Sequence, residues 1–222
     1  MMADSQVVRT SEIELDTERG PARLVTAADV RPRAVLLLGH GAGGGIDAFD
    51  LDALALGLPG RGIAVARFEQ PWRTAGKKVA GPPASLDAAW RSALVEVRRT
   101  WPTAPVFVGG RSAGARVACR CFADPARGVV ALSFPLHPPG RPEKSRLDEL
   151  ALVTGPVLVL QGERDPFGSA GDVRDAVGGS GRHTVVEIKA AGHSLQPGKR
   201  SDPDGAARLI VESVDEFVSE MS

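Results

Sequence analysis

Residues 106–122 read VFVGGRSAGARVACRCF. The first four are apolar or small and predict a buried strand, whereas apolar residues recur at helical spacing after Gly114 and predict a helix. Between them Gly110, Ser112 and Gly114 match G-x-S-x-G, a pattern that also arises by chance, so its setting carries the weight. Small residues beside the serine let a helix begin close to the strand. The stretch therefore predicts a strand–turn–helix unit that presents the Ser112 hydroxyl. The competing interpretation is a simple serine N-cap after a glycine turn.

Strands and helices alternate on both sides of this unit. Apolar strands that alternate with helices predict a mostly parallel central sheet covered by helices on both faces, a three-layer α/β fold. We expect one domain over residues 1–222, with a strand pair in residues 1–30 and the core from about 33 to 222. The expected strands are 12–15, 23–26, 34–38, 63–67, 106–109, 129–134, 157–161 and 184–188. The expected helices are 46–56, 85–100 with Ser85 as N-cap, one that follows the turn within 110–122, 170–177 and 204–221.

Two further polar residues follow expected strand ends. Asp165 lies in GERDPF, directly after the strand VLVLQ, and His193 lies in AAGHSL, directly after TVVEIK. Carboxyl ends of parallel strands meet at one edge of a sheet, so both residues should lie on the same edge as Ser112. A serine nucleophile needs a base, and the base needs a carboxylate that orients it. We expect His193 as the base and Asp165 as the acid, with Glu163 as a nearby alternative.

A glycine-rich loop, GHGAGGG (residues 39–45), follows the strand AVLLL. Glycine lets the backbone approach a ligand closely and aim its N–H groups at it. We expect the N–H groups of Ala42 or Gly43 and of Ala113 to stabilise a developing oxyanion, aided by the N-terminus of the helix after Ser112. His40 is interpreted as a structural histidine of this loop.

The motifs HGAGGG, GGRSAGA, GERDPF and AGHS, in that order, resemble the small α/β-hydrolases grouped near dienelactone hydrolases and carboxylesterases. The segment FPLHPPGRPEK (134–144) resembles a compact subfamily of that superfamily, and the similarity runs from about residue 33 to the C-terminus. The resemblance implies the α/β-hydrolase fold, hydrolytic chemistry and the chain order serine, acid, histidine. Dienelactone hydrolases proper have cysteine where this chain has Ser112, which argues against their lactone substrate.

The segment 135–155 is too short for a helical lid domain, so we expect an open site for small acyl esters, thioesters or amides. Its rim should come from residues 68–72 and 137–141 and from Leu195. Trp72 and His137 are candidate substrate contacts, with simple packing as the alternative for each. Arg111 is a candidate for binding an acidic group of the substrate, with an ion pair as the alternative.

Composition limits the partners. Lys+Arg and Asp+Glu both number 27, so no overall charge favours nucleic acid or an anionic membrane. We expect neither a signal peptide nor a membrane-spanning run, and we expect the two cysteines, Cys119 and Cys121, to be buried free thiols. We therefore expect a cytoplasmic monomer or homodimer that acts on a small molecule, without cofactor or metal.

Two interpretations from other classes compete. Residues 39–44 also match G-x-G-x-x-G, and Glu69 stands where a ribose-binding acid would, which fits a nucleotide-binding oxidoreductase. That interpretation leaves Ser112, Asp165 and His193 unexplained. The other alternative is an inactive α/β-hydrolase scaffold that serves as an interaction protein, since a fold does not guarantee activity.

Overall fold

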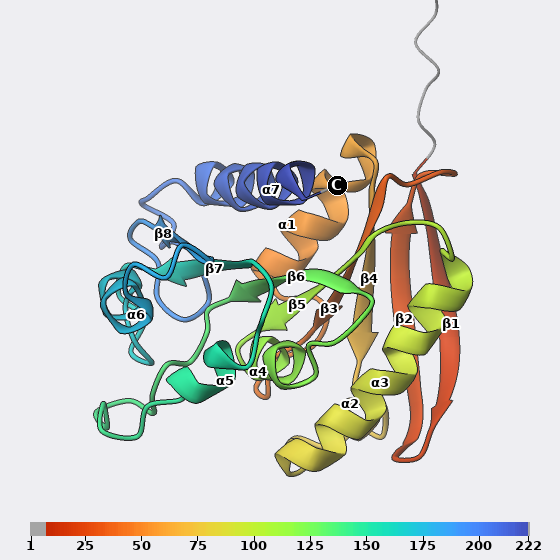
Figure 1. The fold of residues 1–222 in the computed structure, drawn as a ribbon, viewed down its shortest axis with the longest axis horizontal. Helices are drawn as coiled ribbons and strands as arrows, with labels where there is room; N and C mark the ends of the chain where they lie inside the picture. The colour runs from red at the N-terminus through yellow and green to blue at the C-terminus, as the bar shows by residue number, and fades with distance from the viewer. Residues whose placement is uncertain (1–7, 222) are drawn as a thin grey trace, which may run out of the picture.

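The computed structural model describes residues 8–221, so the first seven residues and Ser222 of the expected domain lie outside it. Its strands form a single eight-stranded sheet with the order β1-β2-β4-β3-β5-β6-β7-β8 (Figure 1). The strands are β1 (Arg9–Thr17), β2 (Gly20–Ala28), β3 (Ala34–Gly39), β4 (Ile63–Glu69), β5 (Val106–Arg111), β6 (Ala126–Leu132), β7 (Val157–Gly162) and β8 (His183–Ile188). The α-helices are α1 (Phe49–Gly57), α2 (Pro71–Thr74), α3 (Pro83–Thr100), α4 (Ala113–Arg120), α5 (Leu147–Ala151), α6 (Ala170–Val177) and α7 (Pro203–Glu220), with a 3₁₀ turn at Pro59–Arg61.

Most of the sheet is parallel, which confirms the predicted fold class. β1 and β2 form an antiparallel hairpin, and β2 pairs antiparallel with β4. Every later pairing, from β4–β3 to β7–β8, is parallel. The hairpin strands are longer than the expected 12–15 and 23–26 because the chain stays extended right up to the turn at Gly20. Parallel pairing brings the ends of β5, β7 and β8 to one edge.

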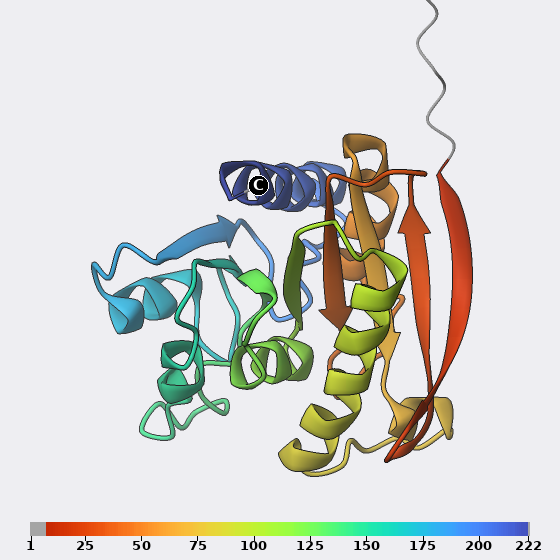
Figure 2. The same cartoon turned by 45° about the vertical axis from the view of Figure 1, so that its right-hand side comes forward.

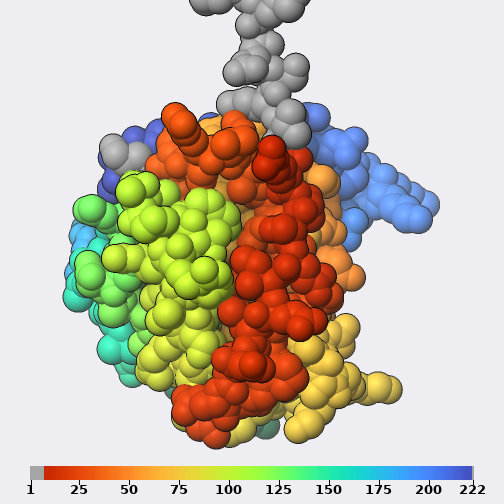
Figure 3. Space-filling model, turned by 90° about the vertical axis from the view of Figure 1, so that its right-hand side faces the viewer, coloured from red at the N-terminus to blue at the C-terminus, as the bar shows by residue number. Residues whose placement is uncertain are grey.

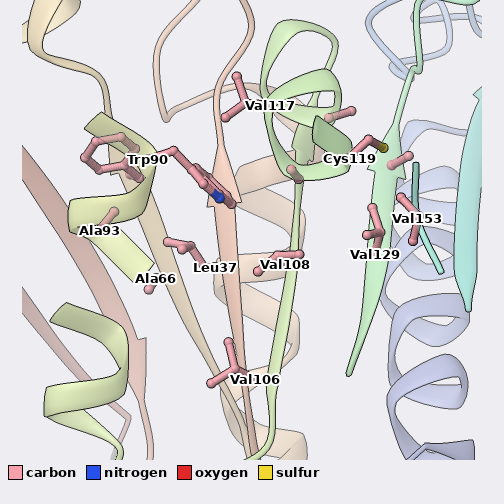
Figure 4. Close-up of a cluster of buried hydrophobic side chains, with 14 of the residues drawn as sticks. Leu37, Ala66, Trp90, Ala93, Val106, Val108, Val117, Cys119, Val129 and Val153 are labelled. Atoms are coloured by element: carbon pink, nitrogen blue, oxygen red, sulfur yellow. The ribbon is translucent and has the colours of Figure 1, made fainter. Parts of the chain in front are cut away.

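Helices cover both faces of the sheet. α3, α4, α5 and α6 lie on one face, and α1 and α7 lie together on the other (Figures 1 and 2). Each face has its own apolar core, because side chains of a strand point alternately to opposite faces. Figure 4 shows the first core, where Trp90 of α3 and Val117 of α4 pack toward Leu37 and Val108 of the sheet. The central strands are buried along their whole length, as the apolar runs predict.

The start of α3 differs from the expectation. The helix begins at Pro83, so the N-cap position is Pro82, and Ser85 lies in the first turn. Proline at the first helical position has a preset φ and lacks only an N–H that would be unpaired there. Ser85 Oγ instead donates to the Pro82 carbonyl at 2.8 Å. The predicted Ser85 cap is therefore wrong. The helix itself lies beside β1, as Figure 3 shows.

Cys119 and Cys121 are free thiols, as expected; Cys119 is buried, but Cys121 is only partly buried. Burial raises the pKa of the Cys119 thiol to about 12 and that of Cys121 to about 11. Both thiols are therefore protonated and unreactive near neutral pH. Within residues 8–221 no helix is both long and apolar enough to cross a bilayer.

Glycines allow β3, β5, β6 and α4 to approach one another closely. A Cβ atom at Gly114 would lie 2.3 Å from the Gly39 carbonyl oxygen, and one at Gly109 would lie 2.2 Å from the Val130 carbonyl oxygen. Both distances are far below van der Waals contact with backbone that has little freedom to move. The first turn of α4 therefore sits against β3 only because residue 114 has no side chain.

We predict that Gly114→Ala lowers the free energy of unfolding by about 2–4 kcal/mol, because the added methyl overlaps the β3 backbone. Gly171→Ala in α6 is the matched control, since its Cβ meets only Ser169 Oγ at 3.6 Å. The control should be neutral or stabilising through helix propensity. Urea unfolding of the three proteins measures this. Equal unfolding midpoints for both variants would contradict the close approach of α4 to β3 at Gly114.

Candidate active site

Ser112 stands between β5, which ends at Arg111, and α4, which begins at Ala113. Its backbone has φ 52° and ψ −108°, an uncommon conformation for a residue with a side chain. Its N–H donates to the Leu132 carbonyl at 2.9 Å, which ties the turn to the end of β6. The strand–turn–helix unit expected from the sequence is therefore present, with the serine at the turn itself and not as a side-chain cap of α4.

The structure brings Ser112, His193 and Asp165 together. His193 Nε2 lies 2.9 Å from Ser112 Oγ, and His193 Nδ1 lies 2.8 Å from Asp165 Oδ2. An ionised carboxylate only accepts hydrogen bonds, so the imidazole proton belongs on Nδ1. Nε2 then has a free lone pair that accepts the Ser112 hydroxyl proton. This is the geometry of a nucleophile, a base and an orienting acid.

Asp165 is held from three sides in a buried position. Besides His193, its Oδ2 accepts from Gln161 Nε2 at 3.1 Å, and its Oδ1 accepts from the Phe167 N–H at 2.9 Å. Gln161 is fully buried and also donates to backbone carbonyls of residues 134 and 168. The alternative acid, Glu163, accepts instead from the Ala190 N–H at 2.7 Å. Asp165 is thus the carboxylate placed against the imidazole.

The loop between β8 and α7 (residues 189–202) carries His193 and is called the histidine loop. Packing contacts that the sequence does not reveal fix its position. The Phe167 ring lies against the His193 imidazole, with ring centroids 4.3 Å apart and planes at 34°. Leu195, expected at the rim, is fully buried in the core beneath the loop and has φ 52°. Phe68, also expected at the rim, is fully buried. Both rim assignments are wrong, because Phe68 lies in β4 and packs in the core, and Leu195 anchors its loop to the core.

His40 fixes the glycine-rich loop. Its Nδ1 donates to the Gly41 carbonyl at 2.8 Å, and its Nε2 accepts the Gln70 N–H at 3.1 Å. This pattern requires a neutral ring, and burial lowers the pKa of His40 below its ordinary value. The imidazole also packs on Trp72, with centroids 5.4 Å apart. These contacts give His40 a structural role in the loop, in agreement with the interpretation of the sequence.

A cleft of about 310 Å³ lies over Ser112 and His193. Its other lining residues are Gly41, Ala42, Gly43, Gly44, Ala48, Phe49, Arg111, Ser194 and Gln196. Ala113 and Trp72 instead line a neighbouring cavity of about 10 Å³, roughly the space of one water, to which Ala42 also contributes. His137 lines neither space, and its N–H donates to the Phe167 carbonyl at 3.1 Å. Trp72 and His137 as substrate contacts stay predictions.

Arg111 lines the cleft, yet its guanidinium is engaged by the protein. It pairs with Asp50 of α1 and donates to backbone carbonyls of the histidine loop. No sequence pattern singles out Asp50, Gln161 or Phe167. The partner of Asp50, Arg111, lies far away in the chain, whereas Gln161 and Phe167 contact the nearby Asp165 without any motif that marks the contact. Among residues 8–221, no group of three or more His, Cys, Asp or Glu side chains is placed to hold a metal ion.

Between β6 and β7 the structure shows only loop and the five-residue α5, so this segment supplies no helical lid over the cleft. A serine–histidine–carboxylate relay at the carboxyl edge of such a sheet defines the α/β-hydrolase class. A family model described as alpha/beta hydrolase domain matches residues 32–221, and the chain belongs to that family. The dinucleotide-binding alternative gains no support, since Glu69 is paired with Arg23 at 2.7 Å.

Solved structures share the fold. An alpha-beta serine hydrolase homologue from Coxiella burnetii superposes with a TM-score of 0.75 at 16% identity, over 94% of this chain and 99% of that one. An α/β serine hydrolase without lid from Xanthomonas campestris superposes with a TM-score of 0.69 at 22% identity, over 96% of this chain and 97% of that one. Est1E from Butyrivibrio proteoclasticus superposes with a TM-score of 0.74 at 15% identity, over 95% of this chain and 98% of that one.

The neutral His40 generates a pH prediction. A buried histidine with a lowered pKa stabilises the fold fully above its unfolded pKa, about 6.5, and this stabilisation is lost as the pH falls below that value. His40→Asn should lower the free energy of unfolding by about 1–3 kcal/mol at pH 7.5, because the Gln70 N–H loses the acceptor that His40 Nε2 provides. The difference in the free energy of unfolding between wild type and variant should become smaller toward pH 5. Urea unfolding at several pH values measures it, and a difference that widens with acid would contradict the neutral assignment.

Proposed function

We propose that this protein is a serine hydrolase that cleaves small acyl esters, or the related thioesters or amides, with Ser112 as nucleophile. The observation that carries the proposal is the continuous relay from Ser112 Oγ through His193 to the buried Asp165, with contacts of 2.9 and 2.8 Å. Family membership and the similarity to serine hydrolase structures support it. The open cleft without a lid favours small substrates.

In the proposed reaction each of the three residues has its own role. Ser112 Oγ attacks the acyl carbon while its proton passes to His193 Nε2, and the electron pair of the carbonyl moves to its oxygen. The tetrahedral intermediate then collapses, the bond to the alcohol breaks, and the His193 proton goes to the leaving oxygen. Water repeats the sequence on the acyl-enzyme and frees Ser112. Asp165 holds the Nδ1 tautomer and stabilises the imidazolium.

The oxyanion would be stabilised by backbone donors. Ala113 is the first residue of α4, directly after Ser112, and Ala42 and Gly43 belong to the loop that lines the cleft beside it. Backbone N–H groups at a helix start carry partial positive charge, and one such donor is worth about 10²–10³ in kcat. We assign the oxyanion site to Ala113 together with Ala42 or Gly43.

Ser112→Ala should abolish turnover of p-nitrophenyl acetate, with a loss of about 10⁴-fold or more in kcat, while the fold is retained. Ser194→Ala is the matched control, because Ser194 lines the same cleft outside the relay. Circular dichroism checks the fold of both variants. Turnover by Ser112→Ala at the wild-type rate would refute the proposal, and an inactive wild type would favour the scaffold alternative.

The identity of the acid has its own test. Asp165→Asn should lower kcat by about 10⁴-fold, since an amide at this position favours the wrong imidazole tautomer. Glu163→Gln should change kcat little, because Glu163 accepts the Ala190 N–H, whereas Asp165 is the carboxylate that contacts His193. Both variants are assayed with p-nitrophenyl acetate. The reverse order of the two effects would show that Glu163 is the acid.

A further inference from the structure

The side chain of Arg111, the variable residue before the nucleophile in G-R-S-A-G, forms a nearly buried ion pair. Its Nη1 lies 3.1 Å from both oxygens of Asp50, and the exposed fractions of the two side chains are 15% and 0%. Burial raises the pKa of the Asp50 carboxyl, and the Arg111 charge opposes that rise. A carboxylate so deeply placed needs this cation, because an unpaired buried charge is strongly destabilising.

The same guanidinium holds the backbone that carries the catalytic base. Nη2 donates to the His193 carbonyl at 2.7 Å, and Nη1 donates to the Ser194 carbonyl at 3.2 Å. The planar fork of arginine suits several fixed acceptors at once, which a lysine ammonium does not match. Hydrogen bonds from a charged donor are stronger than those between neutral groups. The position of the His193 backbone is thus set from the nucleophile turn.

Asp50 connects this contact to a third element. It lies in the first turn of α1, the helix that follows the glycine-rich loop of residues 39–45. The planar guanidinium of Arg111 therefore links three segments: the turn at Ser112, the loop that carries His193, and helix α1, which follows the glycine-rich loop. Its Nη1 and Nη2 groups already donate to acceptors of the protein, and its charge is balanced by Asp50, so neither group is left to bind an acidic substrate.

We propose that Arg111, held by Asp50, is a positioning residue that keeps His193 in register with Ser112, and that it does not bind an acidic substrate group. The inference rests on the proposed function, since it concerns the base of that reaction. Misplacing a catalytic group by about 1 Å can cost about 10²-fold in rate. Loss of Arg111 should therefore lower kcat and leave KM almost unchanged.

The test compares kcat and KM for p-nitrophenyl acetate in wild type, Arg111→Ala and Arg111→Lys. We expect a fall in kcat of about 10–100-fold for alanine and incomplete recovery for lysine. Guanidinium ion at millimolar concentration should restore part of the activity of Arg111→Ala, since the vacated site opens into the cleft. Arg116→Ala is the matched control: this arginine of α4 forms an ion pair with Glu149, with contacts of 2.7 Å, away from the cleft, and its loss should not change kcat.

A second variant separates positioning from folding. Asp50→Leu combined with Arg111→Met removes both charges together, which proteins often tolerate without loss of stability. It should fold and still show the kcat defect, without rescue by guanidinium. Unchanged kcat in the Arg111 variants of an active enzyme would overturn the inference. So would a defect confined to KM for esters that carry a carboxylate, which would assign Arg111 to substrate binding. An inactive wild type would instead count against the proposed function.

Discussion

At Ser112 the chain passes from strand to helix with φ 52°, a backbone conformation that costs about 1–3 kcal/mol for a residue with a side chain. The cost is sustained because β5 is paired on both sides and α4 rests directly on β3. That contact needs glycine at position 114, whose Cβ would otherwise lie 2.3 Å from the Gly39 carbonyl oxygen. The position of the hydroxyl above the sheet edge, and with it the whole relay, depends on this crowded turn.

The sheet supplies the rest of the arrangement. Because β5, β7 and β8 run parallel, the loops after them carry Ser112, Asp165 and His193 to one edge. Each loop is then fixed by buried contacts: Gln161 holds Asp165, and Arg111 with Asp50 holds the backbone at His193. A short loop can therefore present an imidazole with the accuracy that proton transfer requires.

Much of this was predictable from local sequence. Apolar runs gave the strands, and three polar residues at the ends of such runs gave the relay, because their order and placement depend only on strand direction. The helix start at Ser85 was misplaced, since two prolines set the boundary earlier. Leu195 and Phe68 were placed at the rim although they are buried. Sequence patterns do not mark Asp50, whose partner Arg111 is distant in the chain, or Gln161, whose contact with the nearby Asp165 depends on the turn after β7.

The central claim is that Ser112 is an activated nucleophile. A fluorophosphonate probe reports this directly, because it forms a covalent bond only with a serine whose proton is taken up by a base in place. The protein is treated with the probe, digested, and the adduct is located by mass spectrometry. We predict an adduct on the peptide that contains Ser112, absent from protein unfolded in urea before treatment. An unlabelled native protein, or an adduct on another serine, would contradict the account.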